Sequence, residues 1–189
     1  FAFGGIAPIV LPMLIAGLGI VFSIIGTFFV SIKDDNGNVQ GALNLGNWVS
    51  MGLTIVASYF VIKWMLPETM KMAFFGEGVK DIPSLNVFIA VIIGMVVGAA
   101  ISSITEYYTA LGSKPILNIV QQSATGAATN IIAGLATGMM STAMPVILFA
   151  IAIFSSYHFA GFYGVAIAAG AMMATTAMQL AIDAFGPIA

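Results

Sequence analysis

The chain has 189 residues, of which 60% are hydrophobic and only 6% are charged, and its formal net charge is −2. A soluble domain carries about 25% charged residues, so this composition cannot cover a water-facing surface. Five lysines without any arginine make no basic patch for nucleic acid, and the absence of cysteine excludes disulfides and thiolate-bound metals. The single histidine excludes a histidine metal cluster within the chain. The composition therefore indicates an integral membrane protein.

Five apolar stretches are long enough to cross a bilayer as helices, which takes about 20 mostly apolar residues. None shows the period-two pattern of a barrel strand, and a helix satisfies its own backbone polar groups in lipid. We therefore predict an all-α membrane fold with five transmembrane helices in a single region. The chain lacks an initiator methionine, so we expect this region to be part of one larger membrane domain. The predicted spans are residues 5–32, 48–66, 85–110, 127–156 and 159–183.

The segments between these stretches are predicted to be loops or tight turns. Residues 33–47 open with Lys-Asp-Asp-Asn-Gly-Asn, residues 67–84 contain two prolines, and residues 111–126 begin with Leu-Gly-Ser-Lys-Pro. The fourth link, at Tyr157 and His158, is so short that only a tight turn between antiparallel helices fits. The lysines of these links divide evenly between the two sides of the membrane, so a lysine count does not orient the chain.

Three stripes of small residues at four-residue spacing predict close contacts between helices. Small side chains let helix backbones approach one another where lipid supplies no hydrophobic drive for association. We interpret the stripes as packing features. The first two residues of each stripe are Gly94 and Gly98, Gly134 and Gly138, and Gly170 and Ala174.

Asp183 lies at the end of the fifth predicted span, shortly before Gly186 and Pro187. A carboxylate near a helix C-terminus is disfavoured by the macrodipole, which places partial negative charge there. The position makes chemical sense if a cation offsets this repulsion. Gly186 and Pro187 would bend the chain so that its backbone can approach a ligand.

Glu106 lies at the end of the third predicted span, followed by two tyrosines. An ionisable residue in a membrane span is a functional hypothesis by default. Glu106 either orients a cation or the following loop, or is an interfacial glutamate beside aromatic residues of the membrane boundary.

Residues 121–130 are small and polar and directly precede the fourth predicted span. The free N–H groups at the start of that helix could favour an anion. The alternative is an ordinary N-cap supplied by Ser123, Thr125 or Thr129.

Taken in order, these segments resemble a membrane-bound, ion-translocating inorganic pyrophosphatase. The resemblance is firm over residues 101–189 and rests on hydropathy and order over residues 1–100. It implies a helical bundle of about 16 spans, of which these would be the seventh to the eleventh, in a bacterial inner membrane. The matching segments are Glu106-Tyr107-Tyr108-Thr109, Thr125-Gly126-Ala127-Ala128-Thr129-Asn130, Gly134-Leu135-Ala136 and, most specifically, Ala181-Ile182-Asp183-Ala184-Phe185-Gly186-Pro187-Ile188-Ala189.

The resemblance further implies a homodimeric pump that couples the hydrolysis of magnesium pyrophosphate to the movement of H⁺ or Na⁺ across the lipid bilayer. Asp183 would be its catalytic, substrate-binding and metal-binding residue here, because Mg²⁺ neutralises a polyanionic substrate and positions it for attack by water. Glu106, Thr129 and Asn130 would have supporting roles. Mg²⁺ is the implied cofactor and K⁺ the candidate activator.

Two other classes of protein stay open on the residues alone. One is a secondary transporter without a hydrolytic site, and the other is a structural membrane subunit in which Glu106 and Asp183 merely face water. Residues 1–189 by themselves are not expected to hydrolyse pyrophosphate, because the family's Asp-Val-Gly-Ala-Asp-Leu-Val-Gly-Lys-Val-Glu segment lies outside them. The choice between H⁺ and Na⁺ also stays open, because the family's discriminating acidic residue precedes residue 1.

Overall fold

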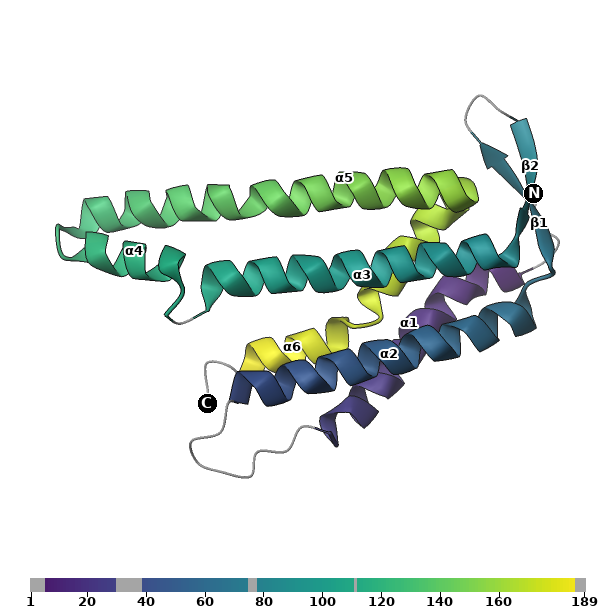
Figure 1. Cartoon of the computed structure of the whole chain (residues 1–189), viewed down its shortest axis with the longest axis horizontal. Helices are drawn as coiled ribbons and strands as arrows, with labels where there is room; N and C mark the ends of the chain where they lie inside the picture. The colour runs from purple at the N-terminus through teal and green to yellow at the C-terminus, as the bar shows by residue number, and fades with distance from the viewer. Residues whose placement is uncertain (1–5, 30–38, 75–77, 111, 186–189) are drawn as a thin grey trace. The chain divides into compact units, whose positions relative to one another are not determined.

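The computed structural model describes residues 6–29, 39–74, 78–110 and 112–185, and these residues are mostly helical (Figure 1). For residues 181–185 it describes the backbone only. Within the described residues, four helical stretches are long and apolar enough to cross a membrane, which confirms the all-α membrane class. The elements in chain order are α1 (Ala7–Thr27), α2 (Val39–Met65), β1 (Thr69–Phe74), β2 (Gly78–Pro83), α3 (Ser84–Thr109), α4 (Lys114–Ser123), α5 (Ala127–Met173) and α6 (Thr176–Phe185).

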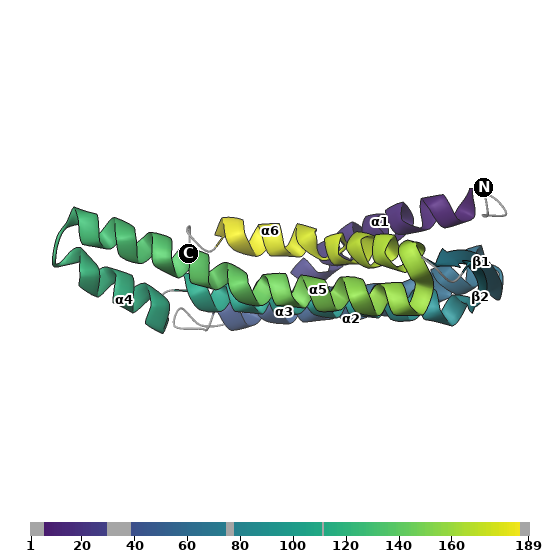
Figure 2. The same cartoon turned by 90° about the horizontal axis from the view of Figure 1, so that it is seen from above.

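The chain forms two compact units, which are described separately. The first unit consists of Phe1–Gly98 together with Ala152–Ala189, and the second is Ala99–Ile151. Helices α3 and α5, labelled in Figures 1 and 2, each contain residues of both units. Each of these two helices therefore has one end in the first unit and the other end in the second unit.

The predicted count of five spans needs correction. The fourth stretch, Ala127–Leu180, has 54 residues and includes both the fourth and most of the fifth predicted span, although its backbone is interrupted within α5 and again between α5 and α6. The interruption expected near Tyr157 and His158 falls slightly later in the chain, because both of these residues are helical. The backbone instead departs from helical geometry at Ala160 (φ −139°, ψ 22°) and Gly161 (φ 59°, ψ −151°). The break falls there because glycine adopts a positive φ without the steric cost of a β-carbon.

The predicted loops also contain regular structure. Helix α2 begins at Val39, inside the expected loop 33–47, while residues 30–38 lie outside the described part. The expected loop 111–126 contains α4, whose start is favoured by a proline in its first turn. The expected loop 67–84 contains the antiparallel hairpin of β1 and β2.

The hairpin has a local physical cause in the alternation of its side chains. Met70 and Ile82 are register partners and both are buried, at 7% and 4% exposure. Their neighbours Lys71 and Asp81 are also paired across the strands and are both exposed. Such opposite-charge pairs and alternating burial stabilise a short antiparallel pair.

The first unit is held together by close packing of α1 on α2. Leu11 and Ile15 are completely buried, and the hydroxyls of Ser23 and Ser50 lie 3.2 Å apart across the two helices. Further along α2, the Thr54 hydroxyl donates to the Ser50 carbonyl at 2.8 Å. These bonds satisfy hydroxyls that would otherwise carry a desolvation cost of about 1–3 kcal/mol each.

Candidate functional site

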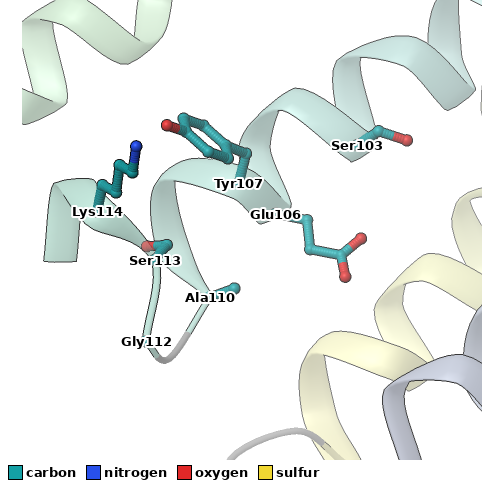
Figure 3. Close-up of a pocket in the computed structure, with 7 residues that line it drawn as sticks. All are labelled: Ser103, Glu106, Tyr107, Ala110, Gly112, Ser113 and Lys114. Atoms are coloured by element: carbon teal, nitrogen blue, oxygen red, sulfur yellow. The ribbon is translucent and has the colours of Figure 1, made fainter. Parts of the chain in front are cut away.

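Glu106 lies in the last turn of α3 and lines an open hollow in the second unit (Figure 3). Its side chain is partly buried, and in Figure 3 its carboxylate points away from Lys114. The ring of Tyr107 extends on the Lys114 side of the helix. The hollow is lined by Ser103, Glu106, Tyr107, Ala110, Gly112, Ser113 and Lys114.

The far wall of this hollow is the start of α4. Ser113 occupies the N-cap position with extended backbone (φ −68°, ψ 148°), yet its hydroxyl makes no capping hydrogen bond. The Ser113 Oγ atom is buried and has no hydrogen-bond partner. Sequence reasoning did not identify Ser103, Ser113 or Lys114, although the Lys-Pro pair at a helix start was a usable signal.

The electrostatics of the hollow do not favour a polyanion. It presents one carboxylate, from Glu106, against one ammonium group, from Lys114. A pyrophosphate ion placed here would be repelled by Glu106 about as strongly as it is attracted by Lys114. The two charged side chains therefore give the hollow no electrostatic preference for the polyanionic substrate expected from the resemblance.

Thr129 and Asn130 lie at the start of α5 and do not line the hollow of Glu106. The Thr129 hydroxyl lies 2.7 Å from that of Thr125 and bonds to the carbonyls of Gln122, at 3.1 Å, and Gly126, at 2.8 Å. These bonds tie the end of α4 to the start of α5. The amide oxygen of Asn130 is buried without a partner.

The N-cap alternative for this corner is wrong in its detail. The hydroxyls of Ser123, Thr125 and Thr129 each donate to a backbone carbonyl, at 3.2, 2.7 and 2.8 Å respectively. A capping hydroxyl would instead accept a hydrogen bond from a backbone N–H. Because these donors are already used within the corner, their function here is to fix the turn between α4 and α5.

Asp183 lies in the last turn of α6, as expected from its place at a helix C-terminus. Helix α6 contacts both α1 and α2 within the first unit. The side chain of Asp183, and the whole of Gly186 and Pro187, lie outside the described part of the structure. Glu106 and Asp183 belong to different units.

The residues with described side chains do not form a complete site for the implied Mg²⁺. Among them there is no group of three histidine, cysteine, aspartate or glutamate side chains that could hold a metal ion. Divalent magnesium requires oxygen ligands, chiefly carboxylates and waters, in octahedral geometry. The described acidic side chains alone fall short of that requirement.

Comparison with known proteins gives a consistent result along the whole chain. The family described as inorganic H⁺ pyrophosphatase matches residues 1–189. The chain is 38% identical to a K⁺-insensitive pyrophosphate-energized proton pump of Caldanaerobacter subterraneus subsp. tengcongensis, over 95% of the chain and 26% of that protein. It is 40% identical to pyrophosphate-energized proton pump 2 of Mycoplana dimorpha, over 94% of the chain and 83% of that protein.

A third relative, like the first, is much longer than this chain. The K⁺-insensitive pyrophosphate-energized proton pump 2 of Moorella thermoacetica is 37% identical over 98% of the chain, which covers 27% of that protein. The chain thus spans about a quarter of the length of the two K⁺-insensitive relatives. The match of the family over residues 1–189, together with the membrane helices, establishes that this chain belongs to the inorganic H⁺ pyrophosphatase family.

Proposed function

We propose that the complete protein is a pyrophosphate-energised proton pump, and that residues 1–189 contribute Asp183 to its hydrolytic site. The observation that carries this proposal is the family match over residues 1–189, which includes an aspartate in the last turn of a membrane helix. The relatives carry the names of proton pumps, which favours H⁺ over Na⁺ as the transported ion.

Asp183 suits this role because of where α6 ends. The macrodipole makes a helix C-terminus unfavourable for a carboxylate, so a carboxylate placed there gains from a neighbouring cation. When bound, Mg²⁺ would neutralise part of the negative charge of pyrophosphate. Asp183 would hold one part of that ion's coordination, together with acidic residues outside residues 1–189, since the described residues are too few to do so alone.

The other residues expected at the site have supporting roles in this proposal. Thr129 fixes the corner between α4 and α5 through its hydrogen bonds, with Asn130 beside it. Glu106 orients a cation or polar group in its hollow and does not contact pyrophosphate. Two relatives are named as K⁺-insensitive, so we propose that K⁺ is not required. We propose a homodimer in a bacterial inner membrane as the working state, with residues 1–189 forming one region of its membrane domain.

The test uses the complete protein in sealed lipid vesicles and compares Asp183→Asn with a matched acidic control, Asp81→Asn. Asp81 is exposed on β2 and is paired with Lys71, outside the membrane helices. Asp183→Asn is expected to lower Mg²⁺-dependent phosphate release from pyrophosphate by about 100-fold or more, the typical loss of one electrostatic stabiliser. Asp81→Asn is expected to keep both hydrolysis and acidification of the vesicle lumen.

Three results would contradict the proposal. Full hydrolysis by Asp183→Asn would remove Asp183 from the site. Ion transport without phosphate release would indicate a secondary transporter. Acidification that requires Na⁺ would exclude proton pumping as the primary transport step.

A further inference from the structure

The membrane segment that carries Asp183 is interrupted between α5 and α6. Ala174 and Thr175 form a turn, in which the Ala174 N–H donates to the Ala171 carbonyl at 3.1 Å, three residues back instead of four. The Thr175 hydroxyl donates to the Met172 carbonyl at 3.3 Å. Regular helix resumes at Thr176. Within a bilayer, such irregular backbone occurs where protein surrounds it, and Ala174 and Thr175 are indeed buried, at 0% and 3% exposure.

The local sequence explains this interruption only in part. Residues 172–176 contain neither glycine nor proline, the residues that usually break a helix. Two consecutive threonines weaken the helix, because a β-branched side chain restricts its rotamers and its hydroxyl can bond to the preceding turn. The remaining cause must come from a neighbouring element.

That neighbouring element is α1, and the contact point is Gly19. A β-carbon built on Gly19 would lie 2.6 Å from the Ala174 Cβ and 2.7 Å from the Ala174 carbonyl carbon. Real β-carbons do not approach other atoms so closely, so the backbone turn at Ala174 fits against α1 only because residue 19 is glycine.

A second contact lies on the other side of the interruption. A β-carbon built on Gly170 would lie 3.0 Å from the Cβ of Pro12, so α5 also approaches α1 closely one turn before Ala174. Beyond the interruption, α6 itself contacts α1. Helix α1 therefore contacts this segment before, at and after its turn. The close approach of Gly19 to Ala174 sets where α6 begins.

We infer that Gly19 is a positioning residue for Asp183, which acts by seating the turn at Ala174 and Thr175 and so fixing the placement of α6. Asp183 follows Ala174 by nine residues, or about 13 Å at about 1.5 Å per helical residue. Helix α6 transmits a displacement at its start to its end as a nearly rigid element. This inference rests on the proposed function of Asp183 for its effect on activity, but not for its effect on α6.

The activity test compares Gly19→Ala with Gly17→Ala in the complete protein. Gly17 lies on the same helix, and within the described part of the chain a β-carbon built there meets no atom within 4 Å. Gly19→Ala is expected to lower kcat/KM for magnesium pyrophosphate by about 10- to 100-fold, since a misplacement of about 1 Å can cost 100-fold. Gly17→Ala is expected to stay within about twofold of the unsubstituted protein. Equal effects of the two variants would overturn the inference.

The structural test does not depend on activity. A fluorine label is attached to a cysteine introduced at Leu180, a position on α6 that is 62% exposed. The ¹⁹F resonance of this label is expected to shift in Gly19→Ala and to stay in place in Gly17→Ala. An unchanged resonance in Gly19→Ala would overturn the inference whatever the activity. A shifted resonance in a protein whose Asp183→Asn variant hydrolyses pyrophosphate normally would overturn the proposed function alone.

A milder variant covers the case in which Gly19→Ala does not insert into the membrane. Thr175→Val keeps the shape of the side chain and removes the hydrogen bond to the Met172 carbonyl. Its label resonance is expected to shift in the same way, with a smaller loss of kcat/KM of about threefold to tenfold, the equivalent of one hydrogen bond. A Thr175→Val variant identical to the unsubstituted protein in both readouts would count against the inference.

Discussion

Two stripes of glycine with the same four-residue spacing lie in different surroundings. In the first unit, a β-carbon on Gly94 would lie 2.8 Å from the Cα of Ala168, and one on Gly98 would lie 3.0 Å from the Met172 side chain. In the second unit, β-carbons on Gly134 and Gly138 would meet no atom of the described residues within 4 Å. The spacing therefore indicates that another helix can pack closely at these glycines. Whether one does so depends on the presence of a partner helix.

The same contrast holds for burial as a whole. The first unit has completely buried side chains on several helices, such as Leu11, Val91 and Ile167. In the second unit, none of residues 99–110 and 112–151 is buried. Apolar side chains such as Leu135 and Met139, both more than two-thirds exposed, need lipid or other protein to cover them. The first unit contains its own core, whereas the second does not.

The largest effect expected from this contrast is that of Gly94→Leu in the complete protein. A leucine at this position would have to separate α3 from the backbone at Ala168, and overpacking of this kind costs about 3 kcal/mol or more. The midpoint of thermal unfolding in detergent should fall strongly. Gly52→Leu is the control, because a β-carbon at Gly52 on α2 meets no atom within 4 Å. If the two variants unfold at the same temperature, the close packing of α3 against the Ala168 segment is not a major source of stability.

A smaller loss is expected from Gly161→Ala, at the break within α5. The backbone angles of Gly161 (φ 59°, ψ −151°) belong to a region that is almost exclusive to glycine, and other residues pay about 1–3 kcal/mol there. Thermal unfolding of the complete protein measures this loss, with Gly17→Ala again as the control. A Gly161→Ala protein as stable as the control would mean that the break is not fixed by the glycine.

The helices of this fold were predictable to the extent that the local sequence determines them. Long apolar runs fix α1 and α3 closely, since α3 covers Ser84–Thr109 and the predicted span was residues 85–110. The hairpin was missed because its strands are short and contain charged residues, so neither strand forms a long apolar run. The turn at Ala174 and Thr175 was missed because it packs closely against Gly19, some 150 residues earlier in the chain.

The helix position of Asp183 was predictable, but the geometry around the other candidate residues was not. The place of Asp183 at the end of a helix followed from the apolar run before it. Thr129 and Asn130 were singled out, yet the bonds of Thr129 to Gln122 and Gly126 show a structural tie that spacing alone did not indicate. The residues that would join Asp183 in the proposed site could not be identified, because the residues with described side chains contain no group of three possible metal ligands.

The smallest expected effect comes from Gly134→Ala, and its sign is informative. With no atom near the added β-carbon in the described residues, alanine should stabilise α5 by up to about 1 kcal/mol through its higher helix propensity. The midpoint of thermal unfolding of the complete protein should therefore stay unchanged or rise, in contrast to Gly94→Leu. A fall in the midpoint would mean that residues outside the described ranges approach this stripe as closely as Ala168 approaches Gly94. Either sign separates a helix face that needs close protein contact from one that only needs an apolar environment.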